Sequence, residues 1–416
     1  MQNDFDAVIV GAGPAGSAAA ILLARAGWSV ALVEKQIFPR RKVCGECIGA
    51  GNLPLLAALG VSGELVASAG PALRKVALMH GHRKAVANLP AAPNQASQWG
   101  HALGRETLDT SLVAQARAVG AHLFQPCTVR SIDGSAGAWR VEIRRDDLPS
   151  GLTLRSRVAI AAHGSWETLP SGRPHRRLDR SGADLLAFKA NFRGASLEAG
   201  VLPVLSFKGG YGGMVMAGGG VTTVACCIRR DRLETSRWSL PGQSAGDVVE
   251  ALLKEECEDV RLVLQGAARD GPWLAAGPID PGVRLRADDE LFRIGNAAGE
   301  AHPIIGEGMS MALQSAWMLC AQLLVCGRSG ASLDKSWQRE VAARYAAQWR
   351  GAFALRLHVA SIFANVAMRP SLAVPFIACA NVWPGLLTLG AQLSGKANCV
   401  VDTGAFPAFA AQPIQI

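Results

Sequence analysis

The 416-residue sequence predicts an α/β fold with three parts: a domain of alternating strands and helices, an inserted β-rich domain, and a helical C-terminal region. Three observations predict this fold. An apolar run at 7–10 leads into a glycine-rich turn and a helix, strand-like alternation fills 183–229, and the last part of the chain is mostly helical in pattern. The expected boundaries are 1–180 with 270–330 for the discontinuous first domain, 181–269 for the insertion and 331–416 for the helical region.

The first strand and helix carry a dinucleotide fingerprint with the spacing GxGxxG, whose residues include Gly11, Gly13, Pro14, Ala15 and Gly16. The glycines permit a tight turn and a close backbone approach to a pyrophosphate, which then sits at the helix N-terminus. The second strand, 30–33, ends at Glu34 and Lys35, where a carboxylate can bind ribose hydroxyls. A glycine-rich turn without a ligand is the alternative, but strand, helix, strand and acid in this order favour a Rossmann-like dinucleotide site.

Strands and helices continue to alternate after the fingerprint. Helices are expected at 53–59, ended by Gly60, and from about 105 to Gly120, with strands at 128–132, 139–143 and 158–162. A late strand, 291–294, leads to a loop at 295–299, and a long helix is expected after the turn at 303–308. Prolines at 370, 375 and 384 break the last third.

Composition and charge restrict the compartment and the partners. Asp4 and Asp6 precede the first strand where a signal peptide would need an apolar segment, and ten scattered cysteines fit a reducing compartment, so we expect a cytoplasmic protein. The net charge of +9 suits a nucleotide cofactor, an acidic partner protein or an anionic membrane surface. Basic clusters such as 40–42 are short and come without a zinc-finger or RNA-binding motif, so neither nucleic acid nor a metal is expected.

Residues 370–395 carry no charge, which raises the question of a membrane contact. Internal prolines and Asn381 argue against a spanning helix, because hydrocarbon offers no water to the backbone groups that a proline frees. We therefore expect a buried lid or pocket wall. A peripheral membrane contact, helped by Arg356 and Arg369, is the alternative.

These blocks together resemble a known superfamily over residues 1 to about 330. It comprises FAD-dependent aromatic hydroxylases (monooxygenases), geranylgeranyl reductases and flavin-dependent halogenases, whose Rossmann-like FAD-binding domain is of the glutathione-reductase type. The resemblance implies that the fingerprint and Glu34 bind the ADP half of FAD, and that Arg105 contacts the phosphate or ribityl region. It also assigns flavin contacts to the late block and to the loop 39–46, on Gly295, Asn296, Gly306, Gly308, Met309, Arg41 and Cys44.

The chain departs from the family pattern at two positions. His163-Gly164 stands where many hydroxylases have Asp-Gly, and Asn296 replaces the aspartate of the late block. Asparagine can still bond a ribityl hydroxyl, whereas the first change leaves the electron donor open between NAD(P)H and a separate reductase. Cys44 and Cys47 form a Cys-x-x-Cys pair, for which a redox dithiol is one interpretation and packing beside the flavin region the other.

The resemblance implies an FAD-dependent oxidoreductase, with monooxygenation of an aromatic or conjugated group as the leading hypothesis. The substrate is a small molecule or a group carried on a partner protein, as in tailoring flavoproteins of secondary metabolism and of tryptophylquinone cofactor biogenesis. The alternatives are a reductase of isoprenoid-like C=C bonds, a halogenase, and a non-catalytic FAD-binding assembly factor. The catalytic candidates are His302, Pro303, Lys42 and Tyr211, with residues 273–278 expected beside the substrate or, alternatively, in ordinary sheet core.

Overall fold

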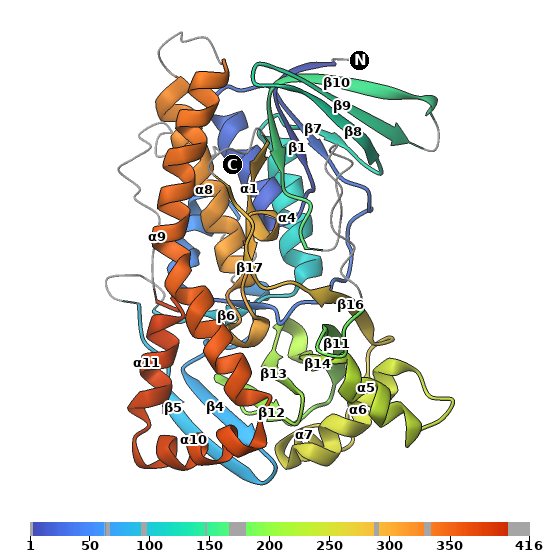
Figure 1. Cartoon of the computed structure of the whole chain (residues 1–416), viewed down its shortest axis with the longest axis vertical. Helices are drawn as coiled ribbons and strands as arrows, with labels where there is room; N and C mark the ends of the chain where they lie inside the picture. The colour runs from blue at the N-terminus through green and yellow to red at the C-terminus, as the bar shows by residue number, and fades with distance from the viewer. Residues whose placement is uncertain are drawn as a thin grey trace.

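Two β-sheets and a long C-terminal helix that spans both organise the chain in a computed structural model (Figure 1). The structure describes residues 3–397 except 62, 64–66, 93–97, 146–147, 166–179, 287–290 and 328–333. One sheet and its helices contain the fingerprint, and the second sheet lies at the other end of the molecule. This arrangement confirms the predicted α/β fold with a helical C-terminal region.

The first sheet has the strand order β7-β2-β1-β10-β9-β8, with β18 paired to β10. Its strands are β1 (Asp4–Val10), β2 (Val30–Val33), β7 (His122–Phe124), β8 (Thr128–Ser135), β9 (Ala138–Arg145), β10 (Leu148–Ala161) and β18 (Phe292–Arg293). β7, β2, β1, β10 and β18 run parallel, so the carboxyl ends of β1, β2, β10 and β18 meet at one edge. Ligands of open α/β sheets bind at such an edge.

Three helices cover one face of this sheet. They are α1 (Pro14–Arg25), α4 (Arg105–Ala118) and α8 (Gly308–Gly327), and their apolar side chains share one core with Ala7 and Ile9 of β1. Val8 and Val10 point to the opposite face, where residues of β8, β9 and β10 cover them. Successive side chains of β1 point to opposite faces of the sheet, and both faces are covered by a hydrophobic core. This explains why residues 7–10 form a continuous apolar run.

The second sheet has the order β15-β11-β14-β13-β12-β4-β5, with β16 paired to β11. Its strands are β4 (Lys75–His80), β5 (Arg83–Asn88), β11 (Leu185–Arg193), β12 (Val201–Phe207), β13 (Gly210–Met216), β14 (Thr222–Arg229), β15 (Ala268–Arg269) and β16 (Leu274–Ile279). β4 and β5 lie within the range expected for the first domain, and β16 lies outside the predicted insertion. The parallel pairing of β12 with β4 brings the early strands into the second sheet.

One face of the second sheet is covered by α5 (Arg230–Trp238), α6 (Ala245–Glu256) and α7 (Glu258–Val263), a helical segment within the range predicted to be β-rich. Short elements join the two sheets: α2 (Leu53–Ala58), β3 (Cys47–Ile48) paired with β6 (His101–Ala102), and β17 (Gly282–Val283) paired with β19 (Gly299–Glu300). The other face of β11, β13 and β14, which α5 to α7 do not cover, lies toward the first domain.

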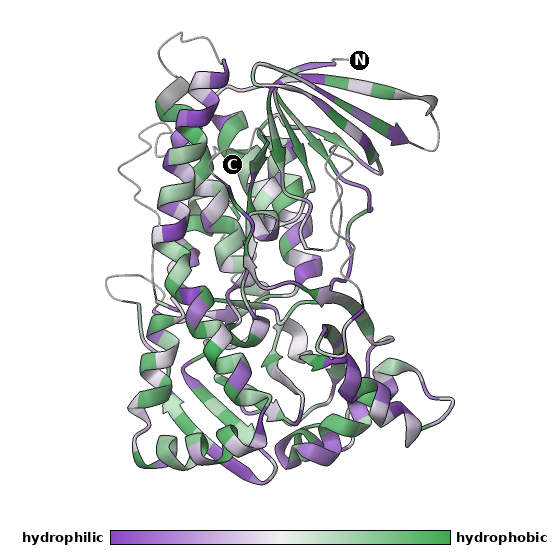
Figure 2. Cartoon of the chain, in the orientation of Figure 1, coloured by the Kyte–Doolittle hydropathy of each residue, from purple (hydrophilic) through white to green (hydrophobic). Residues whose placement is uncertain are grey.

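The C-terminal helices are α9 (Lys335–Ala367), α10 (Pro370–Val382) and α11 (Gly385–Leu393). α9 packs on α8, and α10 and α11 share a core with β4 and β5. Figure 2 shows α10 and α11 coloured largely hydrophobic; Trp383, which follows α10, and Leu389 of α11 are exposed. Arg356 is buried and donates to Gln314, so the expectation that it helps a membrane contact is wrong.

Among the described helices, α8 alone is long and apolar enough to cross a membrane, and 72% of its 18-residue window is buried in the protein. α9 and α10 pass the same test only as a pair, which is bent by 107° at the break between them. Pro370 begins α10 and accounts for that break, because a proline cannot continue the hydrogen bonding of a preceding helix.

Candidate functional site

A cavity of about 220 Å³ lies between the carboxyl edge of the first sheet, the open face of the second sheet and the start of α8. Many of the sequence-predicted site residues line it, from segments almost three hundred residues apart. They are Gly13, Pro14, Ala15, Lys42, Cys44, Arg105, Tyr211, Gly295, Asn296, Pro303, Gly306, Gly308 and Met309. The cavity therefore runs from the N-terminus of α1 to the N-terminus of α8, a length that suits an extended ligand.

The glycine-rich turn leaves no room for side chains on its inner side. Gly11 has a φ of +105°, and a Cβ there would lie 2.5 Å from the carbonyl oxygen of Ala162; at Gly16 a Cβ would lie 1.8 Å from the carbonyl oxygen of Gly11. At Gly13, by contrast, the nearest atom to a Cβ is an Arg105 nitrogen at 3.8 Å. Gly11 and Gly16 thus allow the turn to form, whereas Gly13 keeps the cavity side of the turn open to a ligand.

Glu34 lies at the end of β2, where the fingerprint requires an acid. Its buried carboxylate accepts the backbone N–H of Ala12 at 3.0 Å and lies 3.5 Å from the guanidinium of Arg40. The contact with Ala12 fixes the carboxylate against the turn. Lys35 is exposed and does not line the cavity, so the structure does not bring it to the site.

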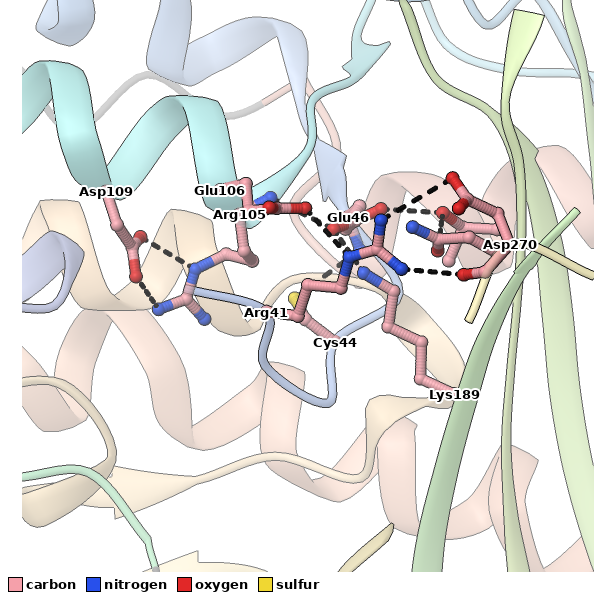
Figure 3. Close-up of polar contacts among 10 residues, drawn as sticks. Arg41, Cys44, Glu46, Arg105, Glu106, Asp109, Lys189 and Asp270 are labelled. Carbon is pink, nitrogen blue, oxygen red and sulfur yellow. Dashed lines mark hydrogen bonds and ion pairs between the residues drawn. The ribbon is translucent and has the colours of Figure 1, made fainter. Parts of the chain in front are cut away.

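Arg105 opens α4 and is buried with its guanidinium against Asp109. Nε and Nη2 donate to the two carboxylate oxygens at 2.8 and 2.6 Å, as Figure 3 shows. Although burial opposes the charge, Asp109 raises the pKa of Arg105, which keeps the guanidinium cationic. Asp109 follows Arg105 by four residues on one helix, a spacing that the sequence displays but that the sequence analysis missed.

Arg41 lies outside the cavity lining. Its exposed side chain contacts Glu106 on α4 at 3.1 Å and Asp270, after β15, at 3.5 Å (Figure 3). Glu106 belongs to a helix that covers the first sheet, whereas Asp270 follows a strand of the second sheet. Arg41 therefore ties the loop 39–47 to both domains, a contact that differs from the predicted flavin contact.

Glu46 anchors the same loop from within, and the sequence analysis did not single it out as a site residue. Its Oε1 accepts the backbone N–H of Arg105 at 2.9 Å and is paired with the buried Lys189 of β11. Its Oε2 accepts the hydroxyl of Thr223 on β14 at 2.6 Å. Lys189 and Glu46 come together across the two domains in Figure 3. The only sequence signal is a lysine within the otherwise mostly apolar strand β11.

Tyr211 and His302 meet at the second-sheet side of the cavity. The tyrosine hydroxyl lies 3.1 Å from Nδ1 of the histidine, and their rings pack edge to face. Burial raises the pKa of Tyr211 and lowers the pKa of His302, so both groups stay neutral at neutral pH. Tyr211 lines the cavity and His302 stands behind it, next to the exposed Pro303. The structure therefore brings together two candidates from distant segments.

The late block forms a polar corner of the cavity around Glu300. The amide nitrogen of Asn296 donates to Ser165 at 2.7 Å and to Glu300 at 3.2 Å, and Arg284 pairs with the other Glu300 oxygen at 3.0 Å. Buried Glu300 is therefore held as an ion-paired carboxylate. These two acceptors orient the Asn296 amide, which fits a side chain that presents a polar group to a ligand hydroxyl.

The loop 39–47 places Lys42 and Cys44 in the cavity lining. Cys44 and Cys47 are free thiols, and burial raises the pKa of Cys47, which makes its thiolate scarce at neutral pH.

Trp273 packs edge to face on Phe192 and donates to Glu250 of α6, on the helix-covered face of the second sheet. For Trp273 the sheet-core alternative holds.

The N-terminus of α8 completes the site. Gly308 lines the cavity, and a Cβ there would meet no atom within 4 Å, so its backbone is accessible to a ligand. The preceding Glu307 is buried and accepts Lys396 Nζ at 2.9 Å. Although burial opposes the charge, Cys47 and Glu307 raise the pKa of Lys396, so a protonated lysine offsets the carboxylate beside the helix terminus.

The residues present fit a bound dinucleotide of the FAD type. One end of the cavity offers a side-chain-free glycine turn and the N-terminus of α1; the other offers the N-terminus of α8, where main-chain N–H groups favour negative charge. Arg105 supplies a permanent cation to the lining beside the glycine turn. Among the described residues, no group of three or more His, Cys, Asp or Glu could hold a metal ion.

Comparison with known proteins assigns a family to this chain. The sequence model described as the FAD binding domain matches residues 4–350. Conditioned medium factor receptor 1 of Dictyostelium discoideum is 25% identical over 78% of this chain. The match covers 64% of that protein's own length. Menaquinone reductase of Mycolicibacterium smegmatis is 28% identical over 79% of the chain and 78% of the reductase.

Solved structures share the fold across nearly the whole chain. The flavin-dependent brominase Bmp2 has a TM-score of 0.74 at 17% identity and covers 98% of this chain and 96% of its own. PqsL, a probable FAD-dependent monooxygenase from Pseudomonas aeruginosa, has a TM-score of 0.69 at 17% identity, with 90% and 99% covered. These identities show the fold alone, and that fold is shared by halogenases and monooxygenases.

Proposed function

Because the chain belongs to the FAD binding domain family, we propose that it is a cytoplasmic monooxygenase that hydroxylates an aromatic or conjugated group. The family and its relatives make it an FAD-dependent oxidoreductase; the choice of hydroxylation is the proposal. The observation that carries it is the Tyr211–His302 pair: Tyr211 lines a mainly apolar cavity that also contains most of the predicted FAD contacts, and His302 lies behind the tyrosine. A neutral proton relay beside a mainly apolar cavity suits oxygen insertion into an aromatic ring.

The reaction is balanced by two electrons and two protons. A substrate C–H group and O2 give C–OH and water, and the flavin would supply the electrons at the cavity. The chain's own groups exclude water with the apolar lining, hold the cofactor at the two helix N-termini, and move the protons. Loss of a proton from a hydroxyl or a ring N–H makes the substrate ring richer in electrons and thereby activates it for hydroxylation.

Tyr211 is placed to take that proton. Its raised pKa keeps the hydroxyl protonated, so it can accept a proton from the substrate only while it passes its own to a base. His302 Nδ1, at 3.1 Å, is that base, and its lowered pKa keeps it unprotonated near neutral pH. The substrate proton thus moves to the Tyr211 oxygen as the tyrosine proton moves to His302.

The electron donor is proposed as NAD(P)H or a separate reductase, and the substrate as a small molecule or a group on a partner protein, which the net charge of +9 suits if that partner is acidic. Reduction of an isoprenoid-like C=C bond is the second candidate. It is favoured by the apolar lining and by the similarity to a menaquinone reductase. Halogenation is the third, because Lys42 lines the cavity.

The deciding experiment follows the electrons and the oxygen atoms of the purified, FAD-loaded protein. The flavin is photoreduced without oxygen and then mixed with ¹⁸O2 and a panel of phenols, anthranilates and indoles, with and without chloride or bromide. We expect one ¹⁸O atom in an aromatic product. In a parallel anaerobic sample the reduced protein meets menaquinone; flavin reoxidation with loss of a side-chain double bond would establish the reductase instead.

The proton relay is tested in the same assay. Tyr211→Phe should lower kcat by about a hundredfold or more while FAD content stays unchanged. The wild-type rate should fall as the pH drops through the lowered pKa of His302, because a protonated imidazole cannot accept the tyrosine proton. His302→Gln should be slow and lose this acidic limb. An unchanged pH profile in His302→Gln would remove the histidine from the mechanism.

A further inference from the structure

We propose that a second, apolar cavity beside the flavin cavity binds a hydrocarbon chain carried by the substrate. This cavity, of about 90 Å³, lies between the second sheet and the C-terminal helices α9 to α11. The sheet contributes Val76, Leu78 and Leu202 to its lining, and the helices contribute Phe363, Phe376 and Leu387. This inference depends on the proposed function at one point: the reacting part of the substrate is taken to lie in the flavin cavity.

The two cavities are adjacent and share part of their lining. Leu202 and Val204 of β12 and Ile304 and Ile305 of the turn before α8 line both. Ile304 and Ile305 follow Pro303 in the late block, so the shared wall lies beside the predicted flavin position. A substrate whose ring lies in the first cavity would therefore direct a substituent past these four apolar side chains into the second.

The polar side chains in the second cavity are already bonded to protein. The Ser206 hydroxyl donates to the carbonyl of Ala367 at 2.6 Å, and the Ser394 hydroxyl to the carbonyl of Ala391 at 2.8 Å. Lys396 donates to the carbonyl of Ile305 at 2.7 Å and pairs with Glu307. A ligand with polar groups would lose its hydration here without replacement bonds, which selects an apolar ligand.

Loose packing of the last helices does not explain this space. A Cβ on Gly390 of α11 would lie 2.6 Å from the ring of Phe363 on α9, so the two helices are in close contact next to the cavity. Ser394 and Ala391, on the same helix end, are nearly fully buried. The cavity is partly open, so its apolar lining is accessible to a ligand and would lose contact with water when an apolar group binds.

These observations identify the substrate class as an aromatic or conjugated ring with an alkyl or isoprenoid chain. The ring would lie near Tyr211, and the chain would leave over Ile304 and Ile305 toward α10 and α11. The uncharged stretch 370–395 then forms the wall of a chain-binding pocket, in line with the pocket wall expected from the sequence.

The test is equilibrium binding of a homologous probe series to the oxidised, FAD-loaded protein. The probes are 4-alkylphenols from methyl to decyl, and the dissociation constant is measured by titration calorimetry. Each methylene that enters the cavity should tighten binding about fourfold, the factor expected from the burial of one CH2 group, until the cavity is full and the affinity levels off. Binding needs no turnover, so a failure of hydroxylation leaves this measurement intact.

Two variants fill the cavity, and one provides a matched control. Ala373→Phe on α10 and Ala391→Leu on α11 place larger side chains in the lining, whereas Ala378→Phe adds the same ring to the exposed side of α10. The dependence on chain length should disappear in either filled variant that retains FAD and a native unfolding midpoint, and persist in Ala378→Phe. An affinity independent of chain length, or a dependence that survives in the filled variants, would overturn the proposal.

Discussion

Glu46 has a backbone conformation that costs a non-glycine residue about 1 kcal/mol or more, with a φ of +56°, and it is nearly fully buried. Lys189 and Thr223 of the second sheet hold its carboxylate there. We predict that Lys189→Met destabilises the FAD-loaded protein by about 3–5 kcal/mol, because it leaves a buried carboxylate without its charge partner. Urea unfolding measures the loss.

The double variant Glu46→Gln, Lys189→Met is the first control, and it should recover much of the lost stability because no unpaired charge remains. Glu340→Gln breaks an exposed ion pair with Arg344 on α9 and should cost less than about 1 kcal/mol. If Lys189→Met were as mild as Glu340→Gln, the pair would not hold the loop.

The fingerprint residues could be predicted because their partners are close in sequence: a turn, a helix N-terminus and an acid twenty-odd residues on. Glu46 and Lys189 are separated by 143 residues, and Tyr211 and His302 by 91, so no local pattern connects them. Arg41 illustrates the reverse error. Its position in the loop suggested a flavin contact, but Glu106 and Asp270 bind its guanidinium.

The turn from β1 to α1 offers a test that separates the fold from cofactor binding. A Cβ at Gly16 would lie 1.8 Å from a backbone oxygen, whereas a Cβ at Gly13 would have room on the protein side. We predict that Gly16→Ala prevents stable folding. Gly13→Ala should fold with a native circular dichroism spectrum but bind FAD at least about tenfold more weakly, a change of 1.4 kcal/mol, because its methyl group occupies the side that faces the ligand.

Gly308→Ala is the companion variant at α8. Its Cβ would meet no protein atom within 4 Å, so the fold should again persist, and any loss of FAD affinity reports the ligand's approach to this helix N-terminus. The affinity of each variant for FAD is measured by adding FAD to the apoprotein and monitoring the flavin fluorescence. Native FAD affinity in Gly13→Ala would contradict the assignment of the pyrophosphate to this turn.

The helices and strands themselves followed local patterns, and most were predictable. The expected helix from 105 to Gly120 matches α4, and the long helix expected after the turn at 303–308 is α8. Membership in a sheet was harder. β4 and β5 lie in a range expected for the first domain and were not predicted as strands; β4 pairs with β12, as Lys75 with Val201, and that pairing depends on the three-dimensional path of the chain. The helices α5 to α7 follow the predicted strand-like stretch 183–229 and lie within the domain that was expected to be β-rich.

The flavin cavity draws its lining from the first sheet, the second sheet and the late block, so FAD binding should stabilise all of them as one unit. A ligand that binds only the folded state adds about 2.7 kcal/mol at a hundredfold excess over its dissociation constant. We predict that FAD shifts a single unfolding transition to higher urea, with the same midpoint for tryptophan fluorescence and circular dichroism. Two transitions, of which FAD moved only one, would show that the second sheet folds independently and that the cofactor binds to the first domain alone.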